Sequence, residues 1–122
     1  STAYYALFHT LCRTCADLLI GANKAKRSRG AWRQVYRALE HKFSKQACRN
    51  KKIISLFPDA IQDFADTYVT MQTKRHEADY DPYLRLTKSE VFADIAIVKQ
   101  VIGAFNAEPK KDRRAFATYV IL

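Results

Sequence analysis

The stretch DAIQDFADTYVTMQTKRHEADYDP, residues 59–82, sets the architecture that the sequence predicts. Its apolar residues recur every three or four positions and form one stripe, made of Ile61, Phe64, Ala65, Tyr68 and Met71. This spacing is typical of an amphipathic helix whose apolar side faces a core. The helix should begin at Asp59 and end at Pro82, because proline lacks the backbone N–H that a helix interior needs.

The last nine residues of this stretch, Lys74–Pro82, bring together cations, an imidazole, carboxylates and a phenol. At about 100° per residue, Arg75 shares a helix face with Asp79, and His76 shares one with Tyr80. We therefore take Arg75, His76 and Tyr80 as the candidate functional residues. The alternative is structural: Arg75 pairs with one of the acids that follow it, and Tyr80 packs at the helix end.

Four further segments have apolar residues at helical spacing, and we predict helices at Thr2–Ile20, Ala31–Phe43, Thr87–Asn106 and Asp112–Leu122. The sequence TKSE at 87–90 has the spacing of a capping box, which marks a helix start. Residues 118–122 taken alone would also fit a strand. With the helix at 59–82, these segments make five predicted helices and an all-α fold.

The length of 122 residues, with 48% hydrophobic content, is enough for one domain with its own core. We therefore predict a single domain over residues 1–122. Because the chain opens on Ser1 and not on Met, we expect that residues preceding it are missing from the sequence.

The formal charge of +9 is concentrated in one segment. Between Lys24 and Lys52 there are eleven Lys or Arg residues and one acid, Glu40. A polyanion such as RNA is the partner that this charge favours, and an exposed basic surface without a partner is the alternative. The candidate nucleic-acid-binding residues are Lys24, Lys26, Arg27, Arg29, Arg33 and Arg37. Trp32 and Tyr36 lie on the apolar stripe of the same predicted helix, where burial is the first interpretation and base stacking the second.

The cysteine and histidine residues give no metal-binding pattern. Cys12 and Cys15 lie inside a helical repeat, and Cys48 is isolated, so we expect buried thiols and neither a zinc site nor a cofactor. His9 lies at the edge of an apolar helix face and is expected to be a core-edge residue unless the fold brings it beside Arg75. No apolar run approaches the length of a membrane span, and we expect a reduced, cytoplasmic protein.

Three segments together resemble the HEPN superfamily: AYYALFH at 3–9, RHEADYDP at 75–82 and DRRAF at 112–116. The resemblance implies an all-α, up-and-down bundle of four to five helices that often forms a homodimer. In active HEPN ribonucleases an Arg, a following polar residue and a His line a cleft across the dimer and cut RNA without metal. The resemblance places Arg75 on the motif's Arg, His76 on its polar position and Tyr80 on the position of its His. Some HEPN proteins are toxins of prokaryotic toxin–antitoxin or defence systems and pair with a nucleotidyltransferase-type antitoxin.

Tyr80 departs from that motif in a way that matters chemically. A phenol with an ordinary pKa near 10 exchanges protons poorly at neutral pH, whereas imidazole does so well. We therefore expect RNA or nucleotide binding, with cleavage weakened or lost. The first alternative is a metal-independent ribonuclease that uses Arg75 and His76. The second is a protein-interaction module that binds a nucleotidyltransferase.

Overall fold

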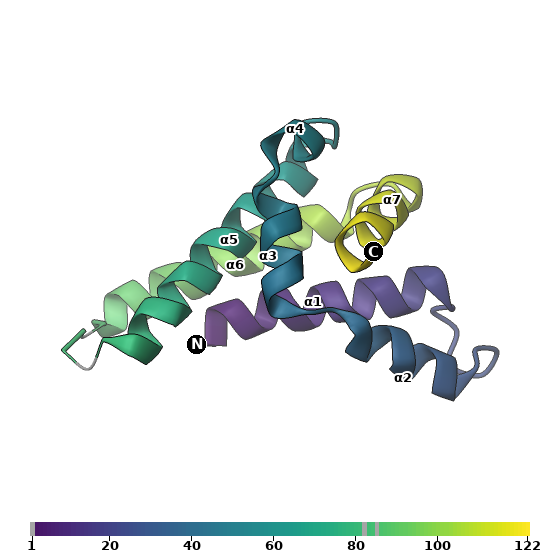
Figure 1. Cartoon of the computed structure of the whole chain (residues 1–122), viewed down its shortest axis with the longest axis horizontal. Helices are drawn as coiled ribbons and strands as arrows, with labels where there is room; N and C mark the ends of the chain where they lie inside the picture. The colour runs from purple at the N-terminus through teal and green to yellow at the C-terminus, as the bar shows by residue number, and fades with distance from the viewer. Residues whose placement is uncertain (1, 82, 85) are drawn as a thin grey trace.

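The computed structural model describes residues 2–81, 83–84 and 86–122, and this part of the chain forms seven α-helices and no strand. The helices are α1 (Thr2–Leu19), α2 (Arg29–Ala38), α3 (His41–Arg49), α4 (Lys51–Ile54), α5 (Asp59–Tyr80), α6 (Lys88–Asn106) and α7 (Lys110–Ile121) (Figure 1). The prediction of an all-α helical protein is confirmed.

Helix α1 is the centre of the bundle, since it contacts α2, α5, α6 and α7. The two long helices α5 and α6 run side by side (Figure 1), and α3 packs against α5 and α7. The apolar stripe predicted for residues 59–71 is buried, and Ile61, Phe64 and Tyr68 have no exposed surface. These side chains meet Tyr4, Leu7 and Leu11 of α1, together with Phe105 and Phe116, in one connected core.

The helix predicted over Ala31–Phe43 is wrong, because the chain forms two helices there. Leu39 and Glu40 have extended backbone angles between α2 and α3, and Leu39 is buried in the core. The break changes which side of the segment faces inward: Ser44, Ala47 and Cys48 are the buried residues of α3, and Phe43 is 44% exposed. Burial of Leu39 thus offsets the loss of helical hydrogen bonds at the junction.

The other helix ends lie within two residues of their predicted positions. Gly21 follows α1 with a φ of 151°, a backbone conformation that favours glycine. Thr87 and Glu90 form the predicted capping box at the start of α6. Residues 118–121 are helical and not a strand. Helix α5 ends at Tyr80, and Pro82, the predicted stop, lies outside the described residues.

All three cysteines are buried, as predicted, and burial raises the pKa of each thiol to about 12. They therefore act as small apolar side chains. The described residues contain no group of His, Cys, Asp and Glu that could hold a metal ion. Within the same residues, no helix has both the length and the apolar character that crossing a membrane requires.

Candidate functional site

Arg75 lies near the end of α5, and its guanidinium group rests on two aromatic rings of α1. Its Cζ atom is 5.1 Å from the centre of the Tyr5 ring and 5.6 Å from that of Tyr4. Such cation–π contacts are worth about 0.5–1 kcal/mol at exposed sites. On the other side, Arg75 Nε is 3.6 Å from Asp79 Oδ2, so the predicted pairing on one helix face is confirmed. Because the carboxylate is 55% exposed, this ion pair holds the arginine only weakly.

His76 and Tyr80 form a separate pair. Their ring centres are 4.5 Å apart, and both side chains are exposed, Tyr80 by 76%. Among the described residues, the ring contacts of Arg75 are with Tyr4 and Tyr5, and neither His76 nor Tyr80 contributes one. The three candidate residues predicted from the end of α5 therefore do not form one compact group.

A second imidazole borders the two rings that Arg75 contacts, and it belongs to His41, the first residue of α3. His41 Nδ1 is 2.5 Å from the Tyr4 hydroxyl oxygen, and the imidazole stacks on Phe8 with ring centres 3.9 Å apart. Burial lowers the pKa of His41, and the positive charges of Arg75 and His9 lower it further. No pattern in the sequence singled out this residue, because the predicted helix over 31–43 placed it inside a helix and off the apolar stripe.

His9 belongs to the same group of rings. Its Nδ1 is 2.9 Å from the Tyr36 hydroxyl oxygen, and its ring is nearly parallel to those of Tyr36 and Tyr5 at centre distances of 6.2 and 6.1 Å. Tyr5 thus links His9 to Arg75, although His9 itself is exposed at the edge of α1. We call this group the α1 ring cluster, and its members are Tyr4, Tyr5, Phe8, His9, Tyr36 and His41.

Buried hydroxyl groups support the α1 ring cluster from below. The Tyr4 and Tyr68 hydroxyl oxygens are 3.3 Å apart, and Tyr68 is 2.7 Å from Ser44 Oγ. Burial raises the pKa of Tyr4 to about 12 and raises that of Tyr68 as well, so both phenols keep their protons at neutral pH. Gln72 Nε2 donates to the His41 carbonyl at 3.0 Å, which ties α5 to the start of α3.

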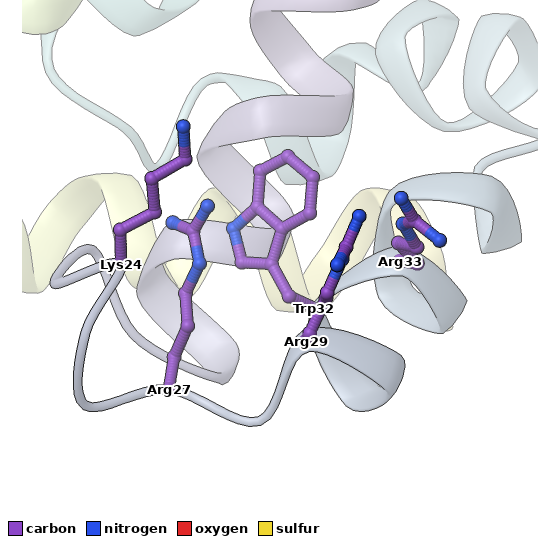
Figure 2. A pocket seen from close by; sticks show the side chains of 5 residues that line it. All are labelled: Lys24, Arg27, Arg29, Trp32 and Arg33. Carbon is purple, nitrogen blue, oxygen red and sulfur yellow. The ribbon is translucent and has the colours of Figure 1, made fainter.

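The basic segment forms a depression of about 530 Å³ where α1 leads into α2. Figure 2 shows the Trp32 indole between Lys24 and Arg27 on one side and Arg29 and Arg33 on the other. Arg27 has a structural role here: Nη1 lies 3.2 Å from Asp17 Oδ1, and Cζ lies 4.2 Å from the Trp32 ring centre. Trp32 Nε1 donates to the same carboxylate at 2.9 Å.

The other five predicted nucleic-acid-binding residues are exposed, and none of them makes an ion pair with another described residue. They are Lys24, Lys26, Arg29, Arg33 and Arg37. The three arginines follow each other at one-turn intervals along α2, about 6 Å apart along the helix axis. We call Arg29, Arg33 and Arg37 the α2 arginine row.

The α2 arginine row leads toward the α1 ring cluster. Helix α2 packs along α1, and Tyr36 on its last turn binds His9. A basic strip therefore extends from the depression toward the rings on which Arg75 rests. No protein-family model, curated protein or solved structure matches the chain. The HEPN resemblance thus stays a prediction from the sequence motifs.

Proposed function

We propose that the protein is a HEPN-like RNA-binding module of a prokaryotic toxin–antitoxin or defence system, with cleavage weakened or lost. The observation that carries the proposal is the α2 arginine row, three exposed guanidinium groups on a helix without an acidic residue. Guanidinium groups bind phosphate oxygens through paired N–H donors. In this proposal the row holds the RNA backbone, and Arg75 anchors a phosphate beside the α1 ring cluster.

The arrangement at the end of α5 favours binding over cleavage. Tyr80 is a phenol, and its ring lies against His76 and not against Arg75. Metal-independent cleavage needs a proton acceptor and a phosphate-binding group within reach of the same phosphodiester. The pair of His76 and Tyr80 and the contacts of Arg75 lie on different faces of α5, so they do not meet this requirement in one subunit.

The direct test is a binding and cleavage assay with end-labelled single-stranded RNA in EDTA. We expect a shifted complex that weakens when salt is raised, and no cleavage products. Arg33→Gln and Arg75→Gln should each weaken the complex. Arg114→Gln is the matched control, because Arg114 is exposed on α7 and makes no ion pair with another described residue. Absence of any RNA complex at low salt would contradict the proposal.

A metal-independent ribonuclease is the second candidate. The supporting observation is that two imidazoles, His9 and His41, belong to the ring cluster that carries Arg75. The sequence motif assigns the roles in this candidate to Arg75 and His76. In the same assay, cleavage in EDTA that is lost in Arg75→Gln would favour this candidate over the binding module. Comparing His41→Gln with His76→Gln would then identify which imidazole takes part.

A protein-interaction module is the third candidate, and exposed apolar side chains support it. They follow one another along the end of α5, the connection after it and the first turns of α6, and they are Tyr80, Tyr83, Leu86 and Phe92, exposed by 76%, 89%, 47% and 68%. Apolar groups collected at one end of a molecule are typical of a surface that a partner covers. A second copy of the chain and a nucleotidyltransferase-type antitoxin are the proposed partners. Light scattering of the wild type and of Phe92→Ser tests the first of these.

A further inference from the structure

His41 and Arg75 both border the Tyr4 and Tyr5 rings. The Tyr4 ring centre is 5.6 Å from both the His41 ring centre and Arg75 Cζ. The Tyr5 ring centre is 6.3 Å from the His41 ring and 5.1 Å from Arg75 Cζ. His41 is also the first residue of α3, and Glu40 before it makes no side-chain capping hydrogen bond. The helix end adds partial positive charge from its unpaired N–H groups.

The order of protons beneath the cluster determines which nitrogen of His41 carries hydrogen. Ser44 Oγ donates to the His41 carbonyl at 3.1 Å, because a carbonyl oxygen only accepts. Tyr68, 2.7 Å away, must then donate to Ser44, and Tyr4 in turn donates to Tyr68. His41 Nδ1 therefore donates to the Tyr4 hydroxyl oxygen. In this order each of the four contacts contains one proton.

The second nitrogen, Nε2, makes no hydrogen bond with another described residue and is therefore the nitrogen left for a ligand. In the neutral imidazole it offers a lone pair, and after protonation it offers an N–H donor. Protonation leaves the bond from Nδ1 to Tyr4 intact, since both nitrogens of an imidazolium ion donate. The hydroxyl chain thus holds the ring in one orientation in both charge states.

We propose that His41 Nε2 and the Arg75 guanidinium bind one phosphate group together, and that proton uptake at this nitrogen strengthens the binding as the pH falls. The proposal rests on the RNA-binding function and adds a second phosphate-binding residue and its pH control. The charged and titratable groups that act on His41 are Tyr4, Tyr5 and His9 from α1 and Arg75 from α5. Behind them, Asp79 pairs with Arg75, and Tyr68 contacts Tyr4.

The direction of the pH effect follows from the charges. Without a ligand, burial and the nearby Arg75 and His9 keep the pKa of His41 below its ordinary value of 6.5, so the imidazole is neutral at pH 7. A bound phosphate places negative charge beside Nε2 and raises the pKa of this group. Binding then takes up one proton, and affinity rises by at most about tenfold per pH unit as the pH falls.

The test measures fluorescence anisotropy of a labelled single-stranded RNA between about pH 7.5 and pH 5.5 at constant ionic strength. The wild type should bind several-fold more tightly at the lower pH, and His41→Gln should lose most of this increase. His76→Gln is the comparison, because it removes a different imidazole, the one on the same helix as Arg75. If the increase disappears in His76→Gln and persists in His41→Gln, the proposal is wrong.

A second measurement does not depend on a substitution. In histidine-ring NMR titrations of the wild type, the pKa of His41 should rise when RNA saturates the protein, and an unchanged pKa in a saturated complex contradicts the proposal.

A third measurement compares RNA that carries a 5′-phosphate with RNA that ends in a 5′-hydroxyl. A larger His41-dependent increase with the former assigns the site to a terminal phosphate, and equal increases assign it to the chain. No binding at any pH contradicts the RNA-binding function itself, whereas binding with the same pH profile in His41→Gln contradicts only the role of His41.

Discussion

Arg75 Cζ lies 5.1 Å from the centre of the Tyr5 ring, although 70 positions of sequence separate the two residues. The ring holds the guanidinium plane in place while the exposed Asp79 competes for it. We expect Tyr5→Leu to weaken RNA binding by about two- to fivefold, the equivalent of one cation–π contact at an exposed site. Anisotropy titrations of both proteins at low salt measure this change.

The control for that substitution is Tyr83→Leu. Tyr83 is 89% exposed and has no ring contact with another described residue, so its replacement removes a phenol without touching Arg75. Equal losses of affinity in the two variants would contradict a specific role for Tyr5.

The α2 arginine row should set much of the salt dependence of RNA binding. For single strands, the slope of log affinity against log salt concentration changes by about 0.7 for each phosphate contact. Replacement of Arg29, Arg33 and Arg37 by Gln together should therefore reduce the slope by about 2. Arg33→Gln alone should reduce it by about 0.7. A wild-type slope in the triple variant would show that the α2 arginine row does not contact the RNA phosphates.

Arg27 should behave differently from the arginines of the row, although it belongs to the same basic segment. Its side chain is 13% exposed and contacts Asp17 and the Trp32 ring. Arg27→Gln leaves the carboxylate and the indole without this partner and should lower the free energy of unfolding by about 1–2 kcal/mol. Urea unfolding followed by Trp32 fluorescence measures the loss. Arg29→Gln is the matched comparison and should change stability by less than about 0.5 kcal/mol.

The buried hydroxyl chain predicts a stability effect as well. Tyr68→Phe removes the contacts with Ser44 and Tyr4 while keeping the ring that fills the core. We expect a loss of about 1–2 kcal/mol in the free energy of unfolding, because buried polar groups lose their partner. Thermal or urea unfolding tests this. A variant as stable as the wild type would show that the hydrogen bonds of the Tyr68 hydroxyl contribute little to the free energy of unfolding.

The sequence predicted what lies within one helix and missed what lies between helices. Periodicity identified the buried stripe of Phe64 and Tyr68 and the pairing of Arg75 with Asp79, because neighbours on one helix face follow from spacing alone. It did not identify the partnership of Arg75 with Tyr5, which depends on how α5 packs against α1.

The site residue His41 was missed for a related reason. It lies at a junction between α2 and α3 that contains neither proline nor glycine, so no local signal marked the break. Arg27 shows the same limit for charges. Composition placed it among the RNA-binding cations, whereas only its position beside Asp17 and Trp32 reveals a structural role.

The lowered pKa of His41 predicts how stability changes with pH in the absence of RNA. In the unfolded chain the imidazole has its ordinary pKa of 6.5, and burial, Arg75 and His9 lower this value in the folded state. As the pH falls below 6.5, the unfolded state takes up the proton first, so the folded state loses stability down to the pKa of folded His41. Urea unfolding should show a larger loss in the free energy of unfolding between about pH 7.5 and pH 5 for the wild type than for His41→Gln.

RNA should reverse this trend, because a phosphate beside Nε2 favours the protonated folded state. Equal pH profiles for both proteins without RNA would show that the surroundings of His41 do not disfavour its charge, and the proposed pH control of phosphate binding would then lose its physical basis.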